Sequence, residues 1–256
     1  MKIAIVTGAS SGLGREFVRQ IAVKTAVEEI WVIARREDRL LQIQEECQIP
    51  VKVLPMDLGK EESIQRLEEL LEGIRPVVSI LVNAAGFGKV GDYSQVTRQE
   101  SDAMINLNCR AAVDVTQACL PYMERKSRIL EICSTAAFQP FQHLNVYAAS
   151  KAFLYRYSRA LWVELFGRGI SVTAVCPYWV KDTEFIPIAK QTDGKNSIRH
   201  FPLASRTKNV VSLAMNDSAL GLLVSTPGPV CFVHRIAAKF IPSQIMMGIW
   251  AVIRRV

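Results

Sequence analysis

Residues Ile3-Ala4-Ile5-Val6-Thr7-Gly8-Ala9-Ser10-Ser11-Gly12-Leu13-Gly14 join an apolar run to a glycine-rich turn and the start of an amphipathic segment. A buried strand followed directly by such a turn and a helix is typical of sites that bind a dinucleotide. Glycines let the backbone approach a pyrophosphate closely, and the unpaired N–H groups of a helix N-terminus attract its negative charge. A tight strand–helix turn without a ligand is the alternative interpretation. The expected contacts of the dinucleotide in this turn are Gly8, Ser10, Ser11, Gly12, Leu13 and Gly14.

Short apolar runs alternate with longer amphipathic stretches along the rest of the chain. The predicted strands are Ile3–Val6, Ile30–Ile33, Val51–Leu54, Val77–Val82, Ile129–Cys133, Ile170–Val175 and Leu222–Ser225. The predicted helices are Leu13–Thr25, Arg36–Cys47, Lys60–Ile74, Arg98–Arg125 and Tyr147–Phe166. This alternation predicts one α/β domain over residues 1–256, a Rossmann-type, doubly wound parallel sheet of about seven strands with helices on both faces. Ligands of such sheets bind beyond the carboxyl ends of the strands, so the residues that follow each strand are the candidate site.

The composition excludes several classes of protein. Of the 256 residues, 50% are apolar and 21% are charged, which excludes a disordered chain or a coiled coil. No apolar run reaches the ~18 residues that span a bilayer, and the N-terminus does not resemble a cleavable signal. We therefore expect a soluble, cytoplasmic protein. The six cysteines show no C-x-x-C spacing and the three histidines lie far apart, so we expect reduced thiols and no metal site.

The net charge of +7 lies entirely in the C-terminal part of the chain. From Ile186 onward there are nine Lys/Arg and two Asp/Glu (9 − 2 = +7), whereas residues 1–185 hold twenty-two of each sign. The plainer interpretation is a solvated basic face. The alternative is attraction for an anionic substrate, an acidic carrier protein or a membrane surface. No recognition-helix or aromatic-basic pattern is present, and we expect no nucleic-acid partner.

The residues after the second predicted strand suggest which dinucleotide binds. An NAD site would place a carboxylate here for the ribose 2′-hydroxyl, whereas arginines can clamp the 2′-phosphate of NADP(H). Arg35 and Arg36 therefore favour NADP(H), although either could be ordinary surface charge at a helix start. Further expected contacts of the cofactor follow the third and fourth strands and are Asp57, Leu58, Asn83, Ala84 and Gly86.

Four polar residues form the candidate catalytic group. Tyr147 and Lys151 are four residues apart in a predicted helix, which places the phenol and the ammonium on one face, with their Cβ atoms about 5–6 Å apart. A neighbouring ammonium and the positive charge of an oxidised nicotinamide would lower the pKa of the phenol towards working pH. Taken alone, this spacing also fits a packing tyrosine with a surface lysine. Ser134 follows the fifth strand and Asn108 lies in the long fourth helix, so we expect both near the same sheet edge.

Together these motifs resemble the short-chain dehydrogenase/reductase family, in its form of about 250 residues, from Lys2 to Thr183. The shared features are the T-G-x-x-x-G-x-G turn, the N-A-x-G segment, the Asn, the Ser and the Y-x-x-x-K, in that order. The resemblance implies that Tyr147 is the general acid–base, while Lys151 holds the nicotinamide ribose and lowers the tyrosine pKa. It also implies that Ser134 binds the substrate oxygen and that Asn108 holds the water of a proton relay.

One departure from the family lies after the sixth strand. The family usually has Pro-Gly there, whereas this chain has Pro177-Tyr178-Trp179, with Thr183 placed to meet the carboxamide. Pro177 and Thr183 are therefore further expected cofactor contacts. Tyr178 and Trp179 form either an aromatic wall for a flat apolar substrate or packing beneath the loop.

Two segments in the C-terminal part of the chain lie outside the motifs that the family shares. Residues 178–209 correspond to the family's substrate lid, and Phe141 and His143 are expected on the opposite wall. Residues 228–256 form an amphipathic extension with two segments, Val230–Phe240 and Ser243–Arg255. Packing on the domain itself or on a partner subunit is the plainer interpretation. A lid on the pocket and a peripheral membrane contact are the alternatives.

These inferences favour an NADP(H)-dependent oxidoreductase that interconverts a ketone and a secondary alcohol. The aromatic candidates and the basic tail favour a bulky apolar substrate such as a hydroxysteroid or bile acid. The enzymatic alternative is a 3-oxoacyl thioester reductase that docks an acidic carrier. An alternative of another class is an NADPH-binding redox sensor or scaffold with little turnover. The family resemblance implies a homodimer or homotetramer.

Overall fold

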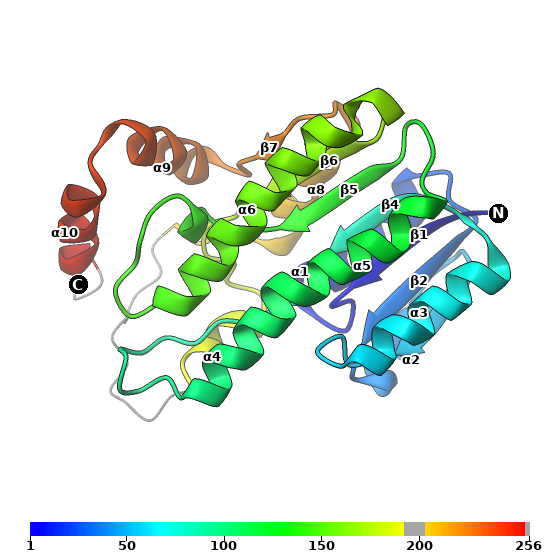
Figure 1. Cartoon of the computed structure of the whole chain (residues 1–256), viewed down its shortest axis with the longest axis horizontal. Helices are drawn as coiled ribbons and strands as arrows, with labels where there is room; N and C mark the ends of the chain where they lie inside the picture. The colour runs from blue at the N-terminus through cyan, green and yellow to red at the C-terminus, as the bar shows by residue number, and fades with distance from the viewer. Residues whose placement is uncertain (192–202, 254–256) are drawn as a thin grey trace.

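The strand–helix alternation folds into a parallel sheet with a layer of helices on each face (Figure 1). The computed structural model describes residues 1–191 and 203–253. In the described residues the sheet has seven strands in the order β3-β2-β1-β4-β5-β6-β7. The strands are β1 (Lys2–Thr7), β2 (Glu29–Ala34), β3 (Val51–Pro55), β4 (Val77–Asn83), β5 (Arg128–Ile132), β6 (Ser171–Val175) and β7 (Val224–Ser225). The predicted doubly wound sheet is therefore confirmed.

The strand order reverses between β1 and β4, which neighbour each other at the centre of the sheet. Their apolar residues are buried because helices cover both faces, which explains why the runs are continuously apolar instead of alternating. The crevice at the carboxyl ends of β1 and β4 is where ligands of this fold bind. The topology thus places the glycine-rich turn after β1 next to the segment after β4.

Each face of the sheet has its own core. On one face, α1 (Gly12–Lys24), α2 (Glu37–Glu46) and α8 (Thr207–Ala219) pack against the strands through side chains such as Phe17, Leu40 and Val211. On the other, α3 (Glu61–Ile74), α5 (Ala111–Cys119) and α6 (Asn145–Leu165) contribute Leu67, Val115 and Leu161. The remaining α-helices are α4 (Arg98–Ile105), α7 (Phe185–Ala189), α9 (Pro229–Phe240) and α10 (Ser243–Ile253).

The structure refines several predicted elements. The long helix expected over Arg98–Arg125 is interrupted by a π-helical turn at Asn106–Arg110, which separates α4 from α5. The predicted lid 178–209 contains the short helix α7, and its residues 192–202 lie outside the described part of the chain. The predicted segment Ser243–Arg255 is helical to Ile253, and residues 254–256 are likewise outside it. None of the described helices has the length and apolar character needed to cross a membrane.

Candidate active site

A cavity of about 590 Å³ opens at the carboxyl ends of the strands. It extends from the glycine-rich turn to a cluster of aromatic side chains. Most of the predicted cofactor contacts line it, namely Gly8, Ser10, Ser11, Gly12, Leu13, Gly14, Arg35, Arg36, Asp57, Leu58, Ala84, Gly86, Tyr147, Lys151, Pro177 and Thr183. The sheet topology therefore gathers residues from five separate loops around one space.

The glycine-rich turn packs directly against the end of β4. Gly8 has a φ of +65°, and a Cβ at this position would lie 2.7 Å from the backbone of Ala84. A Cβ on Gly14 would lie 2.3 Å from the Gly8 carbonyl oxygen. The hydroxyl of Thr7 accepts hydrogen bonds from the N–H groups of Ala84 (3.0 Å) and Ala85 (3.1 Å). Only glycine fits these two positions, and the resulting cradle at the N-terminus of α1 fits the pyrophosphate of a dinucleotide.

Asn83 is the predicted cofactor contact that the described lining of the cavity does not include. Its side chain is buried on the opposite side of β4 from the cavity, where the amide donates to Thr116 Oγ1 (2.8 Å) and Glu131 Oε1 (2.9 Å). Successive side chains of a strand point to opposite faces, and Asn83 points to the face covered by α5. It supports the sheet edge instead of lining the described cavity.

A cluster of charged groups closes the cofactor end of the cavity. Arg36 donates to Ser10 Oγ through Nη2 (3.1 Å) and forms an ion pair with Glu184 through Nη1 (2.9 Å). Arg39 forms a second ion pair with the same carboxylate (2.5 Å). Burial raises the pKa of Glu184, but hydrogen bonds from Arg39 and Arg36 outweigh it and hold this pKa below its usual range. Arg35 is exposed at the rim of the cavity. The arginines thus form a site for an anionic group.

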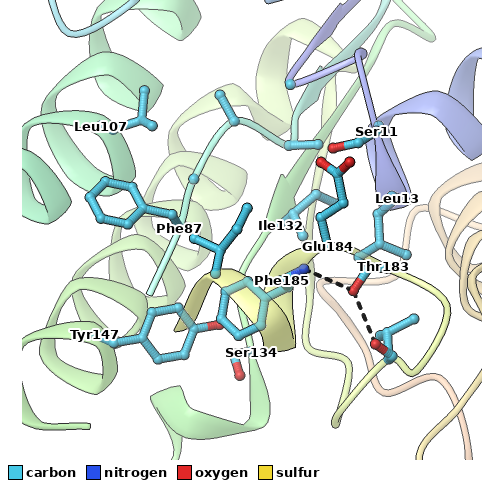
Figure 2. Close-up of a pocket in the computed structure, with 18 of the residues that line it drawn as sticks. Ser11, Leu13, Phe87, Leu107, Ile132, Ser134, Tyr147, Thr183, Glu184 and Phe185 are labelled. Atoms are coloured by element: carbon cyan, nitrogen blue, oxygen red, sulfur yellow. Dashed lines mark hydrogen bonds between the residues drawn. The ribbon is translucent and has the colours of Figure 1, made fainter. Parts of the chain in front are cut away.

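The reactive end of the cavity contains Tyr147, Lys151 and Ser134 (Figure 2 shows Tyr147 and Ser134 beside each other). Lys151 Nζ is buried, donates to the Ile132 carbonyl oxygen (2.7 Å) and lies 5.9 Å from the centroid of the Tyr147 ring. Ser134 Oγ accepts from the N–H of Ala136 (3.0 Å), which fixes the serine at the end of β5. The three side chains converge because β5 ends and α6 begins at the same edge of the sheet.

Burial determines the protonation of this group. It raises the pKa of the Tyr147 phenol, and a hydrogen bond with Ser134 offsets this only in part. Burial also lowers the pKa of the Lys151 ammonium, against smaller opposing contributions from nearby cysteine thiols and Glu131. The protein alone therefore keeps Tyr147 protonated, in contrast to the lowering expected from the lysine. A protonated phenol is the form that donates a proton to a carbonyl oxygen.

Asn108 lies in the π-helical turn between α4 and α5. Its amide accepts from the N–H of Phe87 (3.0 Å) and donates to the Phe87 carbonyl (2.9 Å) and to Ser150 Oγ (3.0 Å). A Cβ on Gly86 would lie 2.8 Å from Asn108 Oδ1 and 3.4 Å from Lys151 Nζ, so the asparagine and the lysine flank the same backbone. π-turns often occur at functional sites because they redirect a side chain. Here the turn fixes the segment after β4 to α6.

Aromatic side chains line the substrate end of the cavity. Of the predicted substrate contacts, Phe141, Tyr178 and Trp179 line it. His143 is not among the described lining residues; its backbone has a φ of +63°, and its carbonyl oxygen accepts a hydrogen bond from the N–H of Gly91 (3.0 Å).

Several lining residues were missed by sequence reasoning. Phe185 of α7 packs against the Tyr147 ring with centroids 5.3 Å apart, and Trp250 of α10 packs edge-on against Phe141 at 5.0 Å. Phe185 lies in the predicted lid 178–209 and Trp250 in the extension 228–256, but no pattern in either segment singled out the individual residue. Glu184, which lines the cavity, and Arg39, which forms an ion pair with it, were not predicted because no sequence motif marks either residue. The described residues contain no group of three or more His, Cys, Asp or Glu that could hold a metal ion.

The fold and this cavity define an α/β oxidoreductase of the dinucleotide-binding class, with a phenol and an ammonium at the reactive end. The sequence profile described as short chain dehydrogenase matches residues 2–193. An uncharacterised oxidoreductase from Staphylococcus epidermidis is 32% identical over 197 residues, which cover 75% of this chain and 82% of the relative. The chain belongs to the short-chain dehydrogenase family, and it is an oxidoreductase that acts on CH–OH and C=O groups.

The chain is also similar to enzymes named for steroid and for acyl-CoA substrates. The 17-beta-hydroxysteroid dehydrogenase type 3 of Mus musculus is 32% identical over 75% of this chain and 63% of its own length. The very-long-chain 3-oxoacyl-CoA reductase of Anas platyrhynchos is 33% identical over 75% of this chain and 64% of its own length. A solved short-chain dehydrogenase from Sphingobium yanoikuyae, in complex with NADPH, is 26% identical, with a TM-score of 0.79 over 97% of this chain and 95% of that chain.

Proposed function

We propose that this protein is an NADP(H)-dependent reductase of a bulky apolar ketone, such as an oxosteroid or an oxo bile acid. The observation that carries the proposal is the cavity itself. One end offers arginines to an anionic group, and the other places Tyr147 and Ser134 against a wall of aromatic rings.

The arginine cluster supports NADP(H) over NAD(H). Arg36 and Arg39 already bind a carboxylate, that of Glu184, at the carboxyl end of β2, and β2 ends in Ala34. A 2′-phosphate carries more charge than a carboxylate and presents several oxygens to paired guanidinium groups. The NADPH in the complex of the Sphingobium yanoikuyae relative agrees with this preference.

The chain's own residues account for the proton chemistry. A bound NADPH supplies the hydride that reaches the carbonyl carbon. Tyr147, whose phenol stays protonated in its buried position, gives its proton to the carbonyl oxygen, and Ser134 donates a hydrogen bond to that oxygen as negative charge develops. Lys151 holds the ribose hydroxyls and places a positive charge beside the phenolate of Tyr147 that forms. Asn108 fixes the backbone of Phe87, in the segment after β4.

A 3-oxoacyl thioester is the second candidate substrate. The relative from Anas platyrhynchos favours it, as does the basic C-terminal part of the chain, which suits an acidic carrier. A redox sensor or scaffold is less favoured, because a pure binder has no need of a tyrosine–lysine pair in the cavity. The exposed Phe153 and Val163 of α6 support a homodimer or homotetramer. The cytoplasmic location stays a prediction.

The proposal is tested by following NADPH consumption with pooled oxosteroids, 3-oxoacyl thioesters and simple ketones, with NADH run in parallel. We expect turnover with NADPH and the oxosteroid pool. Turnover of the thioesters alone would favour the second candidate, and preference for NADH would contradict the role given to the arginines. Tight NADPH binding without turnover of any pool would favour a sensor.

A further inference from the structure

The two C-terminal helices, α9 and α10, expose many large apolar side chains. Figure 1 shows these helices projecting from the body of the molecule past one end of the sheet. We call the set of exposed side chains the arm face, and each of its members is between 43% and 73% exposed. They are Phe232, Val233, Ile236 and Phe240 of α9 and Ile245, Ile249, Val252 and Ile253 of α10.

The exposed side chains form one stripe on each helix. At 100° per residue, the four of α9 fall within an arc of about 100°, and so do the four of α10. The exposed Ile241 lies between the two helices and continues the apolar surface. Apolar patches of this kind mark sites of interaction with a protein or a membrane.

Contacts on their inner sides hold both helices in place. In α10, Met246 and Trp250 are buried, and Trp250 Nε1 donates to the Gln142 carbonyl oxygen (3.1 Å). In α9, Cys231 is buried and the His234 ring packs edge-on against Phe138 and Phe141. The arm face is therefore the outer side of a docked structure and has no cover among the described residues.

The charge of this region indicates the partner. From Ser218 to Val256 the sequence contains no Asp or Glu and four basic residues, Arg235, Lys239, Arg254 and Arg255. Lys239 lies at the border of the arm face, with its Nζ 5.6 Å from the centroid of the Phe240 ring. Helices with an apolar face bordered by lysine and arginine lie in the interface of membranes that carry anionic lipids.

We propose that the arm face binds the surface of a bilayer containing anionic lipids, with the apolar side chains in the headgroup region and Arg235 and Lys239 on lipid phosphates. A second copy of the chain is a poorer partner, because a symmetric contact would bring basic residues of both copies together without a carboxylate from this region. The inner side of the same helix α10 contributes Trp250 to the cavity wall. Docking would thus place the cavity next to the lipid phase.

Co-sedimentation with vesicles tests the proposal without reference to enzymatic activity. The full chain is mixed with vesicles of phosphatidylcholine alone or of phosphatidylcholine with phosphatidylglycerol. We expect binding to the anionic vesicles that weakens as salt increases, since salt screens charge. Substituting Phe232→Ser, Ile236→Ser and Phe240→Ser together should lower the bound fraction about tenfold.

Two further variants separate membrane binding from general effects. Arg235→Gln with Lys239→Gln should weaken binding to the anionic vesicles only. Val23→Ser with Leu220→Ser replaces two apolar residues outside the arm face that are 80% and 76% exposed. This control should leave the fraction bound to vesicles unchanged. Absence of wild-type binding, or equal loss in the arm and control variants, would overturn the proposal. The proposal would also be overturned if the wild type does not bind vesicles and light scattering shows that the arm substitutions dissociate an oligomer. Thermal melting checks that each variant is folded.

Discussion

The Glu184 carboxylate at the start of the lid forms an ion pair of 2.9 Å with Arg36, 148 residues earlier in the chain. The pair joins the segment after β6 to the segment after β2 across the cofactor end of the cavity. It also means that the arginine proposed to bind the 2′-phosphate already holds an anion. NADP(H) must therefore compete with the protein's own carboxylate.

Substituting Glu184→Gln removes this competition. Both residues of the ion pair are partly exposed, so the pair is worth at most about 1 kcal/mol, and we expect the KM for NADPH to fall about two- to fivefold. The measurement is the KM for NADPH at saturating ketone. Glu45→Gln, an exposed carboxylate on α2, serves as the control and should leave this KM unchanged. An unchanged or higher KM in Glu184→Gln would contradict the assignment.

Substituting Arg36→Ala removes the guanidinium that binds both Ser10 and Glu184. A charge-assisted hydrogen bond to a phosphate is worth roughly 1.5–3 kcal/mol, so the KM for NADPH should increase about tenfold or more. The KM for NADH should stay within about twofold, because NADH has no 2′-phosphate. Parallel titrations with the two cofactors check this. An equal increase in the KM for both cofactors would show that Arg36 stabilises the site without binding the 2′-phosphate.

Substituting Trp179→Ala opens the aromatic wall of the cavity. Losing a large apolar contact should raise the KM for a bulky ketone about tenfold and leave that of a small aliphatic ketone nearly unchanged. The matched control is Trp162→Ala, a tryptophan on α6 that is not among the described lining residues. If the KM values for both ketones increase equally, Trp179 has a structural role and the proposed position of the substrate is wrong.

Glu131 of β5 gives the protein a pH-dependent stability. Burial raises its pKa to about 7 from a usual 4.5, although Asn83 and Thr116 donate hydrogen bonds to it. Between these two pH values the folded protein binds the proton and the unfolded chain does not. Stability is therefore fully present below pH 4.5 and is lost as pH rises towards 7, by on the order of 3 kcal/mol.

Glu131→Gln keeps the size of the side chain and removes its titration. Urea unfolding at pH 5 and pH 8 should show a stability loss at the higher pH in the wild type that is smaller in this variant. Glu124→Gln, an exposed carboxylate before β5, should behave like the wild type. An identical pH dependence in all three proteins would mean that Glu131 titrates normally.

The fold could be predicted from sequence because the strands are short, mostly apolar runs rich in β-branched residues. The parallel topology then brings the residues after the strands to one edge, which is why Tyr147, Ser134 and the glycine turn were found together. Which face of β4 receives Asn83 depends on the register of the strand, and no local pattern specifies it. The Glu184–Arg36 contact depends on where the lid lies, and the π-turn at Asn108 leaves no helical periodicity to detect.

The central claim is that Tyr147 transfers the proton while the arginine end of the cavity holds NADPH. It is tested most directly by single-turnover reduction of the best ketone substrate by the wild type and Tyr147→Phe, with NADPH binding measured in both. We predict that Tyr147→Phe binds NADPH with unchanged affinity and reduces the ketone at least about a hundredfold more slowly, because the proton donor is lost. Reduction at the wild-type rate would contradict the account.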